Sequence, residues 1–136
     1  MSATQTPVLE VSNLSARYGK VGALVGATLT VPAGSIVTVI GANGAGKSTM
    51  LNAMMGSLPQ TGHAAGTVQY AGTDVSSWQV ERRVAAGMSL VPERRELFGT
   101  MSVEDNLLLG GFRRYRAREA GWRDTLNEVL DLFPRL

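Results

Sequence analysis

The chain contains no cysteine, which excludes disulfide bonds and metal sites built on thiolates. No window approaches the roughly 18 consecutive apolar residues of a membrane-spanning helix, and the polar start has no apolar core of signal-peptide length. The formal net charge of +2 is too small to indicate a nucleic-acid-binding protein by itself. Its 136 residues are enough for one domain with a hydrophobic core.

Short apolar segments between turn residues predict the strands of the fold. They lie at 7–19, 23–31, 35–41, 66–72 and 88–92. The first strand should bend, because Leu14 falls on the opposite parity from Leu9 and Val11. Residues 35–41 are mostly apolar and β-branched, which favours a strand buried on both faces.

Helix signals alternate with the later strands. They predict helices at 47–55, 76–87, 102–110 and 113–133, with a loop at 58–66. Gly56 is a candidate C-cap, Ser76 and Ser102 are candidate N-caps, and Pro134 should end the last helix. Because strands come first and then mix with helices, the sequence predicts an α/β fold with an antiparallel β portion at the N-terminus.

One loop carries a phosphate-binding pattern. G-x-x-x-x-G-K-[ST] is matched by Gly41, Ala42, Asn43, Gly44, Ala45, Gly46, Lys47 and Ser48. Glycines let the backbone amides wrap a polyphosphate, and the following helix directs its free amides and positive dipole end at the same anion. Lys47 is placed to reach the β- and γ-phosphates, and the Ser48 hydroxyl to bind Mg²⁺. The alternative is a glycine-rich turn with an incidental lysine.

The residues around this loop point to a family. The stretches are "LSARYGKVGALVGATLTVPAGSIVTVIGANGAGKSTMLNAMMGSLP", "GTVQYAGTDVSS" and "LVPERRELFGTMSVEDNLLLGGF". They resemble the nucleotide-binding subunit of ATP-binding-cassette (ABC) transporters, and most closely that of branched-chain amino acid importers. Urea and short-amide importers have similar subunits. The resemblance implies a P-loop NTPase-type core that binds ATP and Mg²⁺.

Further site residues follow only from this resemblance. Tyr18 falls where the family stacks an aromatic ring on adenine, and the alternative is a core or edge-strand tyrosine. Thr49 would add a phosphate contact, or else make a local hydrogen bond. Glu93 replaces the glutamine that most members place near Mg²⁺. A carboxylate can ligate the ion but cannot donate a hydrogen bond to water, and the alternative is a solvated glutamate paired with Arg94 or Arg95.

The C-terminal third has open alternatives. The resemblance implies that 94–106 leads into a helical subdomain that docks on a membrane-embedded partner. Three apolar residues there would supply contact or ordinary core: Leu97, Phe98 and Met101. Five arginines fall between 113 and 123, and they form either a solvated helix face or a contact with the partner or with anionic headgroups. His63 is expected in a surface loop, and Trp78 and Trp122 as packing anchors.

Several family motifs are not in the sequence. It lacks the L-S-G-G-Q signature, the apolar run ending in Asp-Glu and the switch histidine, so no catalytic residue is predicted in this chain. We therefore expect a truncated domain: a flexible 1–7, an ATP-binding core at 8–92, and the Q-loop region with the start of a helical subdomain at 93–136. Without the Asp-Glu strand, residues 35–41 would expose a sheet edge that a second copy could cover.

Two classes of function compete. In the first, the chain is part of a transport ATPase that drives amino acid uptake, with a second ATP-binding subunit head to tail and transmembrane permease subunits as partners. It would lie at the cytoplasmic face of the inner membrane as a peripheral protein. In the second, it is a nucleotide-binding or assembly module without turnover. A phosphate-loop kinase is a third possibility, which the strand-rich front disfavours.

Overall fold

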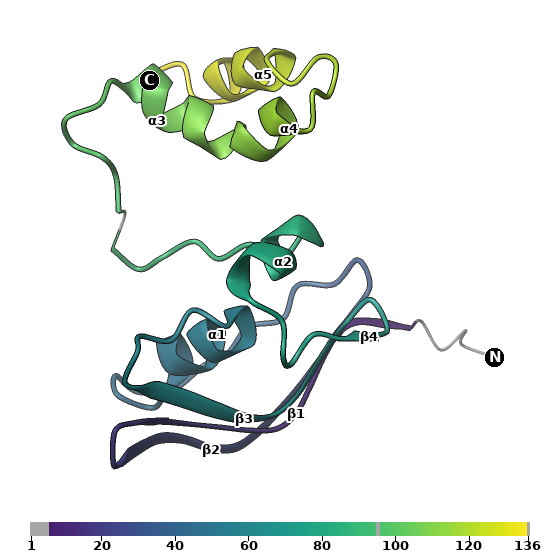
Figure 1. Cartoon of the computed structure of the whole chain (residues 1–136), viewed down its shortest axis with the longest axis vertical. Coiled ribbons are helices and arrows are strands. Elements are labelled where there is room, and N and C mark those ends of the chain that lie inside the picture. Colours follow the sequence, from purple (N-terminus) through teal and green to yellow (C-terminus); the bar gives the residue numbers. More distant parts are fainter. Residues whose placement is uncertain (1–5, 95, 136) are drawn as a thin grey trace. The chain divides into compact units, whose positions relative to one another are not determined.

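The computed structural model describes residues 6–94 and 96–135. The chain divides into two compact units, Met1–Val91 and Pro92–Leu136, which are described in turn (Figure 1). Of the predicted flexible segment 1–7, residues 1–5 lie outside the described part, and Pro7 already begins the first strand.

A four-stranded antiparallel sheet forms the base of the first unit. Its strands are β1 (Pro7–Tyr18), β2 (Val21–Pro32), β3 (Gly62–Tyr70) and β4 (Thr73–Asp74). They lie in the order β2-β1-β3-β4, and every pairing is antiparallel. The predicted antiparallel portion at the N-terminus is confirmed.

The bend predicted in the first strand is a break in strand register. β1 shifts register against β2 between Val11 and Leu14, and Asn13 takes a positive φ of 51° there. A residue inserted in one strand changes which face the following side chains occupy. Val11 and Leu14, which are of opposite parity in the sequence, are therefore both buried.

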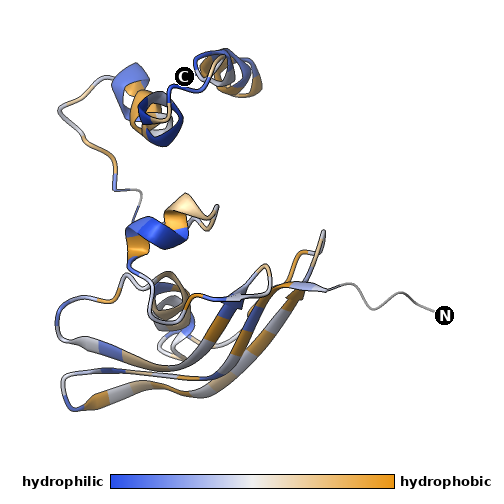
Figure 2. Ribbon diagram, turned by 45° about the vertical axis from the view of Figure 1, so that its right-hand side comes forward, coloured by the Kyte–Doolittle hydropathy of each residue, from blue (hydrophilic) through white to orange (hydrophobic). Residues whose placement is uncertain are grey.

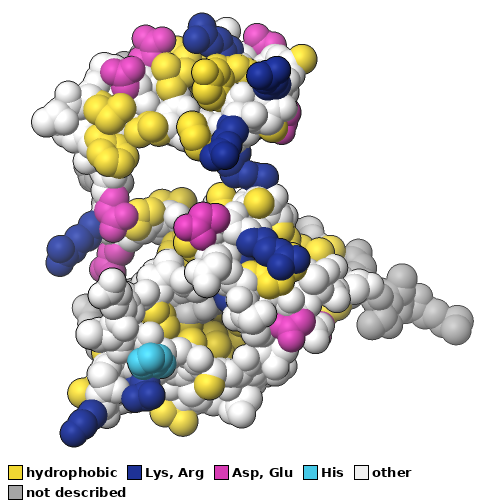
Figure 3. Space-filling view, viewed as in Figure 1, with side chains coloured by type: hydrophobic (Ala, Val, Ile, Leu, Met, Phe, Trp, Pro, Cys, Tyr) yellow, Lys and Arg dark blue, Asp and Glu magenta, His cyan; other side chains and the backbone are white. Residues whose placement is uncertain are grey.

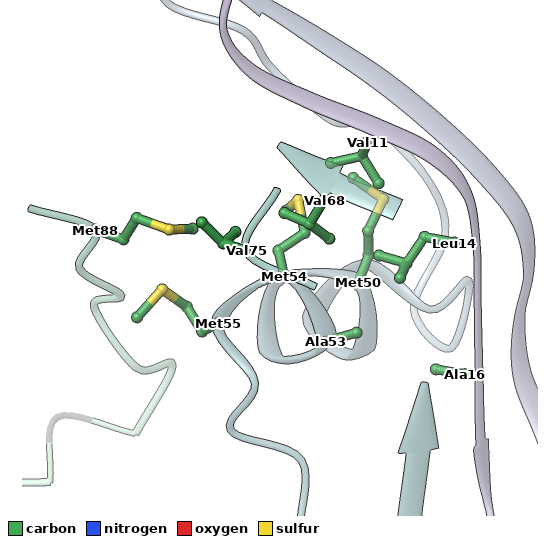
Figure 4. Close-up of a cluster of buried hydrophobic side chains, with 10 residues drawn as sticks. All are labelled: Val11, Leu14, Ala16, Met50, Ala53, Met54, Met55, Val68, Val75 and Met88. Atoms are coloured by element: carbon green, nitrogen blue, oxygen red, sulfur yellow. The ribbon is translucent and has the colours of Figure 1, made fainter. Parts of the chain in front are cut away.

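Helix α1 (Lys47–Met55) contacts β1, β2 and β3, and its bounds are those predicted. Gly56 ends it in the left-handed conformation with φ 68°, as expected of a C-cap glycine. Figure 4 shows α1 directing its side chains at those of the sheet. The core consists of Val11, Leu14, Ala16, Met50, Ala53, Met54, Met55, Val68, Val75 and Met88. Unbranched methionines suit the irregular space between a bent sheet and a helix.

Two predicted strands, 35–41 and 88–92, are wrong. Neither segment forms a strand in the structure, and Ile36 and Ile40 are 97% and 90% exposed. A strand buried on both faces needs a neighbour along each edge to pair its backbone. The described sheet ends at β2 on one side and β4 on the other, and none of its strands pairs with 35–41.

The region between α1 and the second unit also differs from expectation. β3 begins at Gly62, so His63 lies on an exposed strand position and not in a loop. Helix α2 (Val80–Ala85) begins four residues after Ser76. The Ser76 hydroxyl instead accepts from Val68 N at 2.8 Å and donates to Asp74 at 2.6 Å, so it fixes the β3–β4 corner.

Among its described residues, the second unit has three helices: α3 (Val103–Gly110), α4 (Phe112–Arg116) and α5 (Asp124–Leu132). Ser102 caps α3 as predicted, because its hydroxyl accepts from Asp105 N at 3.1 Å. Figure 2 shows mixed hydrophilic and hydrophobic residues along all three helices. Within 6–94 and 96–135, we find no helix with the length and apolar character needed to cross a membrane.

The single helix predicted at 113–133 is wrong. The chain leaves the helical path between α4 and α5, where Arg118 and Gly121 have positive φ values of 54° and 70°. Trp122 then turns back, and its ring meets the Tyr115 ring edge-on at 5.4 Å between centroids. Trp122 thus serves as a packing anchor, as expected, but it joins two short helices.

Candidate functional site

The predicted phosphate loop lies between β2 and α1 in the first unit. Residues 41–46 form turns without regular structure, and α1 begins directly at Lys47. Within the loop, the Ala45 amide donates to the Ala42 carbonyl at 3.2 Å. The loop is therefore a compact turn that opens onto the N-terminus of α1.

Two glycines of the loop occupy conformations that other residues rarely adopt. Gly44 and Gly46 have φ values of 85° and 88°. A Cβ built on Gly46 would lie 2.5 Å from the carbonyl oxygen of Ala23 on β2. Gly46 is thus needed both for its backbone conformation and for the close packing of the loop against the sheet.

Lys47 folds back over the loop that precedes it. Its Nζ donates to the carbonyl oxygens of Gly41 at 2.7 Å and Ala42 at 2.8 Å. These two bonds close the loop into a ring with the ammonium at its opening. The charge is therefore held by neutral carbonyl dipoles and can exchange them for a stronger, ionised acceptor.

The start of α1 adds to this positive potential. Gly46 occupies the N-cap position, where it offers no side chain to accept from the first-turn amides, and no acidic residue lies in the first turn. The first amides of a helix have no partner within it, and the helix dipole is positive at this end. Ser48, in the second position of α1, is exposed on the same turn.

Tyr18 is brought to this turn by the sheet. It ends β1, and its hydroxyl donates to Thr49 Oγ1 at 3.3 Å across 31 residues of sequence. The half-buried ring thus stands beside the first turn of α1. Stacking on adenine by Tyr18 and a phosphate contact by Thr49 remain predictions.

Glu93 belongs to the unit that begins at Pro92, and its side chain is exposed. Across the described ranges, no group of three or more His, Asp or Glu side chains is arranged to hold a metal ion. In nucleotide sites Mg²⁺ is commonly bound by one or two protein oxygens together with oxygens of the phosphates. The metal roles of Ser48 and Glu93 stay predictions.

Arg83 is a residue that the sequence did not single out. It lies on α2, is only 3% exposed, and reaches the C-terminal end of α1. Its guanidinium donates to four carbonyl oxygens: Trp78 at 3.1 Å, Ser76 at 2.8 Å, Ala53 at 3.4 Å and Met54. The only signal in the sequence is its spacing three residues after Val80, which places it on the apolar face of α2.

The charge of Arg83 is compatible with burial because of these partners. Burial lowers the pKa of Arg83 and the nearby Asp74 carboxylate raises it. An arginine remains protonated at any physiological pH. Hydrogen bonds from the hydroxyl and amide of Ser76 hold the pKa of Asp74 below its ordinary value. Arg83 thus places a cation at the negative end of the α1 dipole.

The loop at 41–48 carries the sequence pattern of phosphate-loop proteins, and the structure joins it to a helix N-terminus. Residues 24–134 match the family model of the ABC transporter, and the chain belongs to that family. The α/β class predicted from the sequence is confirmed with it.

Several curated proteins are similar to this chain. The high-affinity branched-chain amino acid transport ATP-binding protein BraG of Pseudomonas aeruginosa is 39% identical over 95% of the chain and 53% of its own length. The hemin import ATP-binding protein HmuV of Bradyrhizobium diazoefficiens is 38% identical over 84% of the chain and 41% of its own length. The ribose import ATP-binding protein RbsA 2 of Escherichia coli is 35% identical over 77% of the chain and 20% of its own length. The chain thus spans about half or less of the length of these relatives.

Proposed function

We propose that this chain binds ATP with Mg²⁺ as part of the ATP-binding subunit of an importer, and that hydrolysis of the nucleotide drives uptake. The observation that carries the proposal is the closed loop of residues 41–46, with the Lys47 ammonium at its opening and the N-terminus of α1 behind it. Three positive elements converge there: a side-chain cation, backbone amides and a helix dipole. A polyphosphate is the ligand that satisfies all three.

Each side chain of the site has a role in this proposal. Lys47 leaves the carbonyls of Gly41 and Ala42 for the β- and γ-phosphates, because a charged acceptor forms a stronger hydrogen bond than a carbonyl. The Ser48 hydroxyl binds Mg²⁺, with Glu93 as a further candidate ligand. Tyr18 offers its ring face to adenine, and its bond to Thr49 fixes the ring beside the phosphate-binding turn.

The wider role rests on the relatives. BraG, 39% identical, is named for branched-chain amino acid transport, and we propose branched-chain amino acids as the solute. Relatives named for ribose and hemin import match over less of the chain. A second ATP-binding subunit packed head to tail and transmembrane permease subunits are the proposed partners, at the cytoplasmic face of the membrane. A urea or short-amide importer is the alternative within the same class.

The 136 residues contain neither an L-S-G-G-Q motif nor an apolar run ending in Asp-Glu. We therefore propose that these residues by themselves bind nucleotide without turnover. Purified chain should release no phosphate from ATP with Mg²⁺ above the uncatalysed rate. Sustained Mg²⁺-dependent release that is lost in Lys47→Ala would overturn this part of the proposal.

Nucleotide titration with and without Mg²⁺ tests the binding site. Lys47→Ala should lower the affinity for ATP at least tenfold, because charge-assisted hydrogen bonds to the phosphates are lost. Lys20→Ala removes the other lysine of the chain, which is exposed in the β1–β2 turn, and should leave affinity unchanged. Equal affinity of Lys47→Ala and the unmodified chain for ATP would reject the site.

Tyr18 is tested with two substitutions and two ligands. Tyr18→Ala should lower the affinity for ATP more than the affinity for inorganic triphosphate, since only ATP has a base to stack. Tyr18→Phe keeps the ring and removes the hydroxyl that donates to Thr49, so it should retain most of the preference for ATP. If Tyr18→Ala weakens both ligands alike, Tyr18 acts only through the position of α1.

A further inference from the structure

The positive charge of this chain is concentrated in one short stretch of the second unit. Residues 112–123 hold five of its 13 basic side chains and only one of its 11 acidic side chains. Without this stretch the chain would be net acidic, although as a whole it carries +2. We name residues 112–123, which comprise α4 and the turn that follows it, the α4 surface.

Aromatic rings lie among these arginines and are open to solvent. Phe112 and Tyr115, which are 51% and 60% exposed, are three residues apart and so lie side by side on α4. Tyr115 meets the Trp122 ring edge-on at 5.4 Å, and the Arg123 guanidinium lies 5.3 Å from the centre of that ring. Figure 3 shows basic and hydrophobic side chains next to one another in the unit of α3–α5. The rings and the Arg123 cation thus form one continuous patch.

The one acidic residue of the α4 surface, Glu119, is paired with an arginine of the same surface. Arg114 Nε donates to Glu119 at 2.9 Å, and Arg114 Nη1 donates to Thr125 at 2.6 Å on α5. Arg114 therefore neutralises Glu119 and ties α4 to α5 at the same time. The net charge of the patch comes from the other arginines, and its shape is held by this link.

Most acidic groups of the same unit lie outside the α4 surface, and Glu104 and Asp105 are in the first turn of α3. Asp124, Glu128 and Asp131 follow one another on α5 at spacings of four and three residues, which places them on one face of that helix. Arginines are thus concentrated on α4 and the turn that follows it, whereas the carboxylates of the neighbouring helices lie on α3 and α5.

We propose that the α4 surface docks on a membrane that contains anionic lipids. Arginines attract phosphate headgroups, and long arginine side chains can bury their stems while keeping the charge at the headgroups. Exposed Phe and Tyr rings add an apolar contribution at the interface between headgroups and acyl chains. A nucleic acid would instead need a basic track along its length, whereas here the arginines occupy one compact stretch in an otherwise acidic chain.

Co-sedimentation with vesicles tests this proposal. The chain should bind vesicles of phosphatidylglycerol mixed with phosphatidylcholine, and binding should increase with the phosphatidylglycerol fraction. Binding should fall when salt is raised from 50 to 500 mM, because this change shortens the Debye length about threefold. Vesicles of phosphatidylcholine alone should bind it at least tenfold more weakly. Equal binding to both kinds of vesicle would overturn the proposal.

Matched charge variants separate the α4 surface from net charge. Arg116→Gln with Arg118→Gln should lower partitioning on anionic vesicles about tenfold or more, because each arginine near the surface contributes to binding. Lys20→Gln with Arg94→Gln removes the same charge from exposed positions outside the α4 surface and should have less than a threefold effect. Similar losses of vesicle binding in the two double variants would reject the α4 surface as the docking site.

Two further arms distinguish the lipid from other polyanions and from the nucleotide site. Phe112→Ser should weaken vesicle binding but leave binding to soluble heparin unchanged, since only a bilayer accepts an apolar ring. Loss of heparin binding in equal measure would indicate a soluble polyanion partner and overturn the lipid assignment. Lys47→Ala should bind vesicles normally, so failure of the nucleotide site and failure of this proposal give different results.

Discussion

At the scale of single residues, two cations occupy the ends of α1 in different ways. Lys47 lies at the N-terminal end, where it is held by the carbonyls of Gly41 and Ala42. Arg83 lies at the C-terminal end, where it is buried and donates to Ala53 and to Met54. The first can change partners without unfolding the protein. The second adds a buried donor at the helix end, to the Met54 carbonyl and to the Ala53 carbonyl, which also accepts from the Gly56 amide at 3.1 Å.

Arg83→Met should lower the free energy of unfolding by about 3 kcal/mol, because it strips several buried carbonyls of a charged donor. Arg83→Lys should recover only part of the loss, since an ammonium cannot reproduce the fork of the guanidinium. Urea unfolding measures both. Arg82→Met is the matched control: Arg82 is exposed and lies 3.9 Å from the centre of the Trp78 ring, so about 1 kcal/mol at most is expected. Equal losses in Arg83→Met and Arg82→Met would show that Arg83 does not hold α1.

At the scale of elements, the sheet depends on one close approach between strands. Gly66 on β3 has a φ of 124°, and a Cβ there would lie 2.6 Å from the Asn13 carbonyl oxygen and 2.7 Å from Leu14 Cα on β1. Both neighbours are backbone atoms and cannot move alone. The register of β1 against β3 shifts at this point, between Ser12 and Ser15. The bend that carries Val11 and Leu14 into the core is thus matched by a glycine on the adjacent strand.

Gly66→Ala should therefore destabilise the protein by about 2 kcal/mol or more through strain and collision. Gly22→Ala provides the control on β2, where an added Cβ has no atom within 4 Å and φ is not positive. That change should be neutral or stabilising by up to about 1 kcal/mol, because it restricts the unfolded chain. Thermal unfolding should therefore show that the melting temperatures of the two variants change in opposite directions or by very different amounts. Small and similar changes in the two melting temperatures would mean that the backbone at the bend accommodates the added Cβ at little cost.

At the scale of the whole molecule, burial is distributed unequally between the two units. Every buried side chain of the described residues lies in Met1–Val91, and α3, α4 and α5 have none. The stability of a segment follows the apolar surface it buries. The helices of the second unit are therefore held mainly by a cap, the Arg114 link and partly exposed contacts.

Hydrogen exchange should reveal this difference directly. Amides of β1, β3 and α1 should exchange through the global unfolding of the first unit, while amides of α3–α5 should exchange at least tenfold faster through local opening. Mass spectrometry of peptic peptides from 7–70 and 103–132 measures both sets in one sample. Equal protection of the two sets would show that the second unit is stabilised by contacts beyond its own helices.

Some features of the protein were determined by the sequence alone. The bounds of α1, its Gly56 cap, the Ser102 cap and the bend in β1 were all predicted, because each depends on a few adjacent residues. Two of the loop glycines, Gly44 and Gly46, likewise have the positive φ that a glycine-rich loop predicts. Residues 41–48 were identified through a local sequence pattern, whereas Tyr18, Thr49 and Glu93 were named only through the resemblance to the family.

The tertiary structure decided the features that depend on distant partners. Residues 35–41 have the composition of a buried strand, but a strand forms only where another strand pairs with it, and no described strand does. Ser76 looks like a helix cap, yet the Val68 amide and Asp74 take its hydroxyl. Arg83 is one of two adjacent arginines in the sequence, and only the packing of α2 beside the end of α1 buries it. The physical reason is common to all three: local sequence sets which hydrogen bonds and contacts a residue can make, and long-range packing selects among them.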